Sequence, residues 1–110
     1  MRTPYWPLER VQVLAEANQL FVQVGRALAF FKTREAAVCA ARETILNLTV
    51  RAFAETVQLT WDRADVYGVI LDGTGWYLKI TIDESVPEVA VISFHPLERP
   101  LKTNGGTVRP

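Results

Sequence analysis

The stretch Trp76-Tyr77-Leu78-Lys79-Ile80-Thr81-Ile82-Asp83 alternates apolar and polar residues throughout. A period of two is typical of a β-strand that buries one of its faces. The alternation predicts that the apolar set faces a core. The opposite, open face then carries Tyr77, Lys79, Thr81 and Asp83. Because a phenol and an ammonium group would lie side by side there, we expect the functional surface of the protein, if it has one, on that face.

This strand is expected in the middle of an antiparallel meander. The residues Asp72-Gly73-Thr74-Gly75 have strong turn chemistry and would connect it back to an apolar strand at 65–71. A loop at 84–88, which contains Pro87, would lead on to a third strand at 89–95, where Pro96 ends the pairing.

The register of the third strand decides which residues join the open face, because a slip of one residue exchanges the two faces. Placing Ala90, Ile92 and Phe94 inward gives the larger buried surface. That choice puts Ser93 and His95 on the open face, beside Tyr77 and Lys79. The residues Val89 and Val91 favour the other register.

The first half of the chain is predicted to be mostly helical. A helix begins near Pro7 and continues to about Asn18, a short edge strand covers 20–24, and a short helix covers 26–32. Thr33 is a suitable N-cap for a further helix, whose apolar stripe contains Val38, Ala41, Ile45 and Leu48. Thr49 would cap another short turn, which carries Ala52 and Phe53.

These elements predict an α+β fold with the helices packed on one face of an antiparallel sheet. The 110 residues suit one domain, residues 1–95, followed by a basic tail rich in proline and glycine at 96–110. Such a tail is by default a mobile terminus. Alternatively, Arg99 and Lys102 reach over the open face and bind phosphate groups.

Composition limits the classes of function. The chain has 12 basic residues (lysine and arginine) and 12 acidic residues (aspartate and glutamate). The net charge is therefore close to zero and does not by itself indicate binding to nucleic acid or to a membrane. Cys39 is the single cysteine, and His95 is the single histidine, so neither a disulfide framework nor a usual zinc site is expected. With no apolar signal region near the start, we expect a soluble cytoplasmic protein without a cofactor or a membrane partner.

The chain resembles the MqsR family of bacterial toxins, the motility quorum-sensing regulators. The two strongest matching segments are Asp65-Val66-Tyr67 and Tyr77-Leu78-Lys79-Ile80-Thr81. Further matching positions are Arg2-Thr3-Pro4, Val11, Leu14, Asn18-Gln19, Ala27-Leu28, Leu48-Thr49, Phe53 and Ile92-Ser93-Phe94.

This resemblance implies a RelE-like fold and an mRNA interferase, a metal-independent endoribonuclease that an antitoxin encoded nearby holds inactive. The family's catalytic set is a lysine, a glutamine and a tyrosine. The tyrosine corresponds to Tyr77. The lysine position falls near Glu55 and the glutamine position on Ala64, so this chain differs at two of the three positions.

Cleavage of RNA without a metal requires a proton acceptor, a proton donor and cations that stabilise the charge on the phosphate. The candidates for proton transfer are Tyr77 and His95, with Lys79 as the cation beside them. A lone histidine before a proline, or a lysine on a sheet, is more commonly a plain surface residue. The candidate phosphate-binding residues are Arg51, Arg63, Arg99 and Lys102.

Two alternatives stay open. The first is a non-catalytic interaction module of the same fold that binds an antitoxin-like protein or RNA. The second is an unrelated small enzyme, and a deep pocket away from Tyr77 would count in favour of this alternative.

Overall fold

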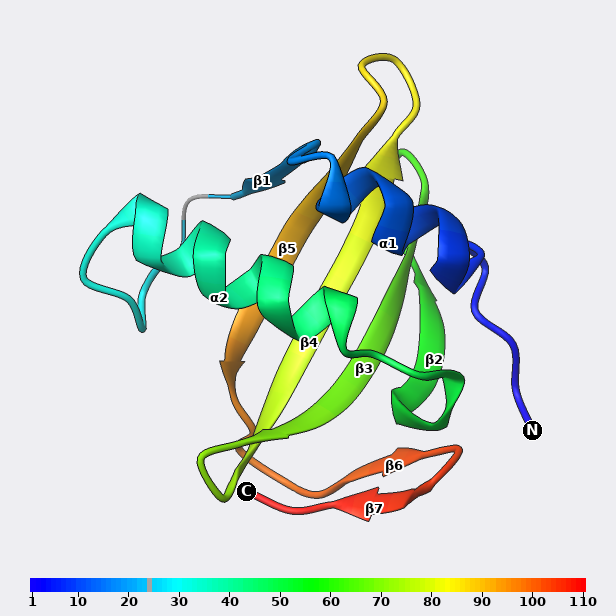
Figure 1. Ribbon diagram of the computed structural model, residues 1–110. Helices are drawn as coiled ribbons and strands as arrows, with labels where there is room; N and C mark the ends of the chain where they lie inside the picture. The colour runs from blue at the N-terminus through cyan, green and yellow to red at the C-terminus, as the bar shows by residue number, and fades with distance from the viewer. Residues whose placement is uncertain (24) are drawn as a thin grey trace.

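A five-stranded sheet forms the centre of the α+β fold in the computed structural model, which describes residues 1–23 and 25–110 (Figure 1). Its strands are β1 (Leu20–Val22), β2 (Phe53–Gln58), β3 (Arg63–Leu71), β4 (Thr74–Asp83) and β5 (Glu88–Pro96), in the spatial order β1-β5-β4-β3-β2. The other elements are α1 (Leu8–Glu16), α2 (Arg34–Leu46), the 3₁₀ turn η1 (Val50–Ala52), β6 (Leu101–Thr103) and β7 (Gly106–Val108).

The meander of β3, β4 and β5 confirms the prediction for the second half of the chain. Asp72 and Gly73 both have positive φ, 51° and 78°, as a two-residue turn of type I′ requires. The sheet is nevertheless mixed, because β1 runs parallel to β5. The prediction of a wholly antiparallel sheet was therefore wrong at this edge, although the edge strand itself forms. Val24, the last residue of that predicted strand, lies outside the described residues.

The strand β2 was not predicted. It pairs antiparallel with β3, and its register shifts between Phe53 and Glu55. This irregularity leaves Phe53 and Ala54 both buried, so the segment lacks the alternation that marks β4. A local pattern could not reveal a strand whose inward residues are consecutive.

A second irregularity settles the register of β5. Leu78 pairs with Phe94 and Lys79 with Ser93, but Ile80 then pairs with Val91. The extra residue, Ile92, lets Phe94 face the core together with Val89 and Val91. The prediction was right for Phe94, Ser93 and His95 and wrong for Ala90 and Ile92, because the β-bulge turns Val89 and Val91 inward along with Phe94.

Both predicted long helices form, with small differences at their ends. The Thr33 hydroxyl accepts a hydrogen bond from the Ala36 backbone N–H at 3.0 Å, which confirms the N-cap of α2. Helix α1 ends at Glu16 because Asn18 takes a left-handed conformation with φ 61°. Residues 26–32 form turns and bends, so the helix predicted there was wrong.

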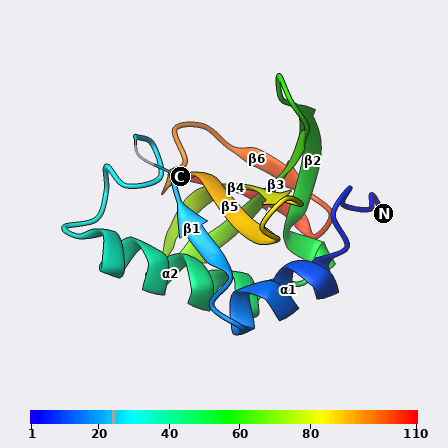
Figure 2. The same ribbon diagram turned by 90° about the horizontal axis from the view of Figure 1, so that it is seen from above.

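The tail forms an ordered hairpin on the side of the sheet opposite the helices (Figure 2). Glycines on the sheet permit the close approach. A Cβ at Gly68 would lie 3.0 Å from Leu101 Cδ2, and one at Gly75 would collide with the backbone carbonyl of Arg109. The Asn104 backbone N–H donates to the Phe53 carbonyl at 2.9 Å. Residues 101–108 therefore cover one end of the open face and are not a mobile terminus.

The buried Asp65 carboxylate fixes the N-terminal segment to the sheet. It accepts hydrogen bonds from the backbone N–H groups of Tyr5 at 3.0 Å and Trp6 at 2.8 Å, and from the Thr56 hydroxyl at 2.7 Å. The Trp6 indole N–H donates to the Arg63 carbonyl at 3.0 Å. Three donors thus satisfy a carboxylate that burial would otherwise penalise.

Candidate functional site

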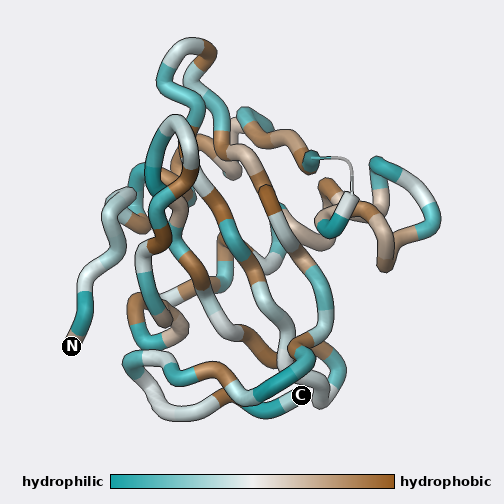
Figure 3. Tube along the Cα trace, turned by 180° about the vertical axis from the view of Figure 1, so that it is seen from behind, coloured by the Kyte–Doolittle hydropathy of each residue, from teal (hydrophilic) through white to brown (hydrophobic). Residues whose placement is uncertain are grey.

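A cleft of about 500 Å³ lies on the open face of the sheet. Figure 3 views the molecule from this side, with the strands in front of the helices. The pairing of β4 with β5 sets Tyr77 opposite His95 and Lys79 opposite Ser93 on the cleft floor. The remaining lining residues are Arg26, Glu55, Leu97, Glu98, Arg99, Pro100 and Leu101.

The rings of Tyr77 and His95 stack at the centre of this cleft. Their centroids are 5.1 Å apart and their planes differ by 12°. His95 is buried, whereas Tyr77 is half-buried. The phenol and the imidazole are thus held in contact by the pairing of β4 with β5.

The two nitrogens of His95 have different partners. Nδ1 lies 2.8 Å from the Pro96 carbonyl oxygen, which only accepts, so Nδ1 carries a hydrogen. Nε2 lies 3.0 Å from Nη2 of Arg26, which only donates, so Nε2 accepts. These contacts place the hydrogen on Nδ1 and leave Nε2, beside Arg26, as the accepting nitrogen.

Arg26 contacts two residues at the end of β5 and just beyond it. Besides contacting His95, its Nη2 atom donates to Glu98 Oε1 at 2.9 Å. Both side chains of this ion pair are well exposed, so solvent screens it. The guanidinium can therefore exchange its carboxylate partner for a phosphate at small cost.

The environment of Tyr77 keeps its phenol protonated. Burial raises the pKa of Tyr77 above its ordinary value, and the Glu55 carboxylate raises it further, while the Arg26 guanidinium acts in the opposite direction. A protonated phenol in a cleft can donate a proton to an oxygen of a bound ligand.

The structure brings together four of the residues singled out from the sequence. Tyr77, Lys79, His95 and Arg99 all line the cleft. The other three predicted phosphate-binding residues do not. Arg63 lies over the ring of Tyr5 at 5.0 Å, Arg51 lines a different hollow, and Lys102 is exposed on β6. Of the two residues of the predicted clamp, Arg99 thus lines the cleft and Lys102 does not.

Sequence reasoning missed Arg26, Glu55 and Glu98 as cleft residues. Arg26 was assigned to a helix and Glu55 to a segment without a predicted strand. The position of Glu55 did carry one signal, because the resemblance placed the family's lysine near it. The strand β2 brings that position to the cleft, with a carboxylate in place of an amine.

A larger hollow of about 1120 Å³ lies between the end of α2, the β3–β4 turn and the tail hairpin. Its ionisable lining residues are Glu43, Arg51 and Asp72. The smaller cleft is the better candidate site because it places a phenol and an imidazole in contact, whereas the larger hollow is mainly apolar and backbone surface. We rank the two hollows by the reactive side chains that they bring together and not by their volume.

Among residues 1–23 and 25–110, no three side chains of histidine, cysteine, aspartate or glutamate are grouped so that they could hold a metal ion. Within the same residues, no helix is long and apolar enough to cross a membrane. Neither a scan with protein-family models nor a search of curated proteins finds a match to this chain.

Proposed function

We propose that this protein is an endoribonuclease of the toxin type, with RNA bound in the open-face cleft. One observation carries the proposal: an imidazole with an accepting nitrogen and a protonated phenol stack in a cleft that three cations line. Cleavage of RNA needs a proton acceptor, a proton donor and charge stabilisation at one phosphate, and this cleft offers all three.

In the proposed reaction, the ribose 2′-oxygen attacks the adjacent phosphorus and the bond from phosphorus to the 5′-oxygen breaks. His95 Nε2 accepts the 2′-hydroxyl proton after the substrate has displaced Arg26. The Tyr77 phenol donates a proton to the departing 5′-oxygen, and the two groups exchange protons with water afterwards. The ammonium of Lys79 and the guanidinium groups of Arg26 and Arg99 stabilise the charge on the phosphate.

The wider setting of the proposal comes from the MqsR resemblance. It comprises a RelE-like fold, a cytoplasmic site of action on messenger RNA and inhibition by an antitoxin protein encoded nearby. The two strongest segments of that resemblance lie in β3 and β4, and β4 carries Tyr77 and Lys79 of the cleft.

A second candidate function is a non-catalytic module that binds RNA or an antitoxin-like protein. Two observations favour it. Arg26 occupies the accepting nitrogen of His95, and the Glu55 carboxylate stands where the resemblance would place an amine. The first feature blocks the proton acceptor while it leaves a cation in the cleft for a ligand, and the second removes a cation that would stabilise charge on the reacting phosphate.

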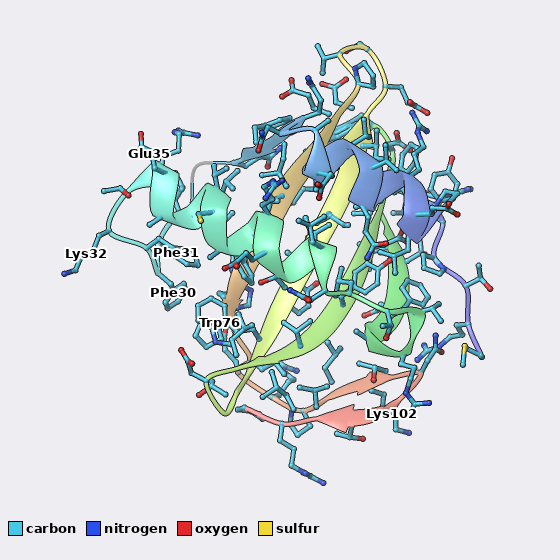
Figure 4. All side chains as sticks on the ribbon, in the orientation of Figure 1. Phe30, Phe31, Lys32, Glu35, Trp76 and Lys102 are labelled. Carbon is cyan, nitrogen blue, oxygen red and sulfur yellow. The ribbon has the colours of Figure 1, made fainter. Side chains whose placement is uncertain are left out.

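Incubation of the purified chain with a defined messenger RNA, in the presence of a chelator and with or without ribosomes, separates the two candidates. The endoribonuclease should cut at fixed positions, and Tyr77→Phe and His95→Ala should each slow cutting by about 10²-fold or more. Lys79→Ala should weaken RNA binding, with Lys32→Ala as the matched control. In Figure 4, Lys32 points away from the sheet.

Cutting that both Tyr77→Phe and His95→Ala leave unchanged would come from a contaminant and would remove the catalytic proposal. RNA binding without cutting by a folded sample, with Lys79→Ala weakening it, would support the binding module instead. Absence of both cutting and binding would overturn both RNA-based candidates.

A further inference from the structure

Two adjacent phenylalanines at the edge of β5 have different surroundings. Phe31 stacks on Phe94 with ring centroids 5.5 Å apart and packs against Trp76 at 5.9 Å. Phe30 is 56% exposed, and its ring centroid lies 6.3 Å from those of both Trp76 and His95. Figure 4 shows Phe30 and Phe31 below α2, close to Trp76. Phe30 therefore offers an uncovered aromatic surface directly beside the cleft.

Contacts on both sides of Phe30 hold it in this position. The Leu28 and Ala29 backbone N–H groups donate to the Gly25 carbonyl at 2.9 and 3.0 Å, and Ala27 is fully buried. The packing of Phe31 fixes the following residue. The exposed ring is thus attached to an anchored turn, so a ligand that stacks on it would pay little to order it.

The edge at which Phe30 lies is free of strand pairing. β1 pairs with β5 only from Val89 to Val91, so the stretch from Ser93 to Pro96, which pairs with β4 on one side, has no strand on its other side within the described part of the chain. A ligand in the cleft can therefore extend past His95 and over this edge to Phe30.

We propose that Phe30 is a stacking platform for one nucleobase of the RNA, next to the phosphate held in the cleft. This inference rests on the proposed binding of RNA. Proteins bind single-stranded nucleic acid by combining cations along the backbone with aromatic rings under the bases. Here Arg26, Lys79 and Arg99 supply the cations, and Phe30 supplies the uncovered ring beside them.

The charge of the cleft favours this occupant over a peptide strand at the same edge. Its three cations outnumber its two carboxylates, Glu55 and Glu98, and the ion pair between Glu98 and Arg26 is exposed enough to open. A polyanion with flat bases satisfies both the cations and the ring. A peptide strand would use the ring but not the cations.

The test measures, by fluorescence anisotropy, how tightly the protein binds a 2′-O-methyl RNA oligonucleotide, which resists cleavage. The reference ligand is an abasic oligonucleotide of equal length. Phe30→Ala and Phe30→Leu should each weaken binding of the RNA by about tenfold and leave binding of the abasic chain unchanged. Phe30→Trp should retain the affinity, and the new indole fluorescence should be quenched by the RNA only. Trp61→Ala is the matched control, because Trp61 is 60% exposed and does not line the cleft.

Equal RNA affinity of the wild type, Phe30→Ala and Phe30→Leu would overturn the inference while leaving RNA binding in the cleft intact. An equal loss for both oligonucleotides would also overturn it, since the ring would then be structural. If the wild-type protein bound neither oligonucleotide, the proposed function itself would fail. Binding of a peptide but not of RNA would indicate that the free edge of β5 pairs with a strand of a partner protein, and would overturn the inference.

Discussion

The phenol ring of Tyr77 lies nearly parallel to the imidazole of His95, with 5.1 Å between their centroids. The two residues are direct partners in the pairing of β4 with β5, so the backbone of the sheet sets their contact. In the same cleft, Arg26 donates to the imidazole nitrogen that faces the open side.

Removal of the Tyr77 hydroxyl should distinguish the role of the hydroxyl as a proton donor from the packing role of the ring. Tyr77→Phe keeps the ring on His95 but removes the donor, so we expect cleavage to fall by about 10²-fold or more with little change in thermal stability. Because the pKa of Tyr77 is raised above its ordinary value of about 10, the wild-type phenol stays protonated at neutral and mildly alkaline pH. The wild-type rate should thus show no decline from this group between pH 7 and about pH 9. A decline that Tyr77→Phe abolishes within that range would contradict this assignment.

Neutralisation of Glu98 should strengthen the binding of RNA. The carboxylate occupies the Arg26 guanidinium, and Glu98→Gln frees that cation for a phosphate. We expect the affinity for RNA to rise severalfold, because Arg26 then binds the phosphate without first leaving a carboxylate partner and the cleft carries one negative charge less. Glu84→Gln, which removes the partner of Arg10 outside the cleft, is the matched control. Unchanged affinity for Glu98→Gln would show that Arg26 does not reach the RNA.

Asp65→Asn should destabilise the fold. The amide would present an N–H group to the donors of Tyr5, Trp6 and Thr56, which leaves at least one of these groups unsatisfied. We expect a loss of about 2–4 kcal/mol in the free energy of unfolding, measured by urea denaturation. Asp62→Asn serves as the control, since Asp62 is only half-buried and its side-chain oxygen can still accept from the Arg63 backbone N–H in the amide. A loss for Asp65→Asn no larger than for the control would show that the N-terminal segment is held by other contacts.

Tyr67→Phe should leave the fold as stable or make it more stable. The Tyr67 side chain is fully buried, and its hydroxyl has no hydrogen-bond partner among residues 1–23 and 25–110. Loss of this unsatisfied group should raise the free energy of unfolding at pH 7 by up to about 1 kcal/mol. Tyr5→Phe, at an exposed position, should change it little.

The same variant has a predicted pH dependence. Burial, and next the Asp65 carboxylate, raise the pKa of Tyr67 above that of an unfolded tyrosine. This raised pKa contributes stability that is fully present below about pH 10 and is lost as the pH rises further, because the unfolded chain then releases a proton that the folded chain keeps. The advantage of Tyr67→Phe over wild type should therefore grow above pH 10. A constant difference up to pH 11 would show that the hydroxyl is not buried in solution.

The sequence alone determined the elements whose signals are local. Alternation predicted β4 and the shared face of Tyr77 and Lys79, turn chemistry predicted the meander, and a side-chain cap predicted the start of α2 at Thr33. Each signal lies within about ten residues, where backbone sterics and side-chain direction act without the rest of the fold.

Tertiary structure decided the rest of the candidate site. Arg26 meets His95 across 69 residues of sequence, and the tail hairpin joins the N-terminus through Asn104 and Arg2, which are 102 residues apart. The β-bulge at Ile92 resolved a register that neither apolar set could settle alone. These outcomes depend on how much apolar surface the whole chain buries and which polar groups it then satisfies. That balance exists only once distant segments are packed together.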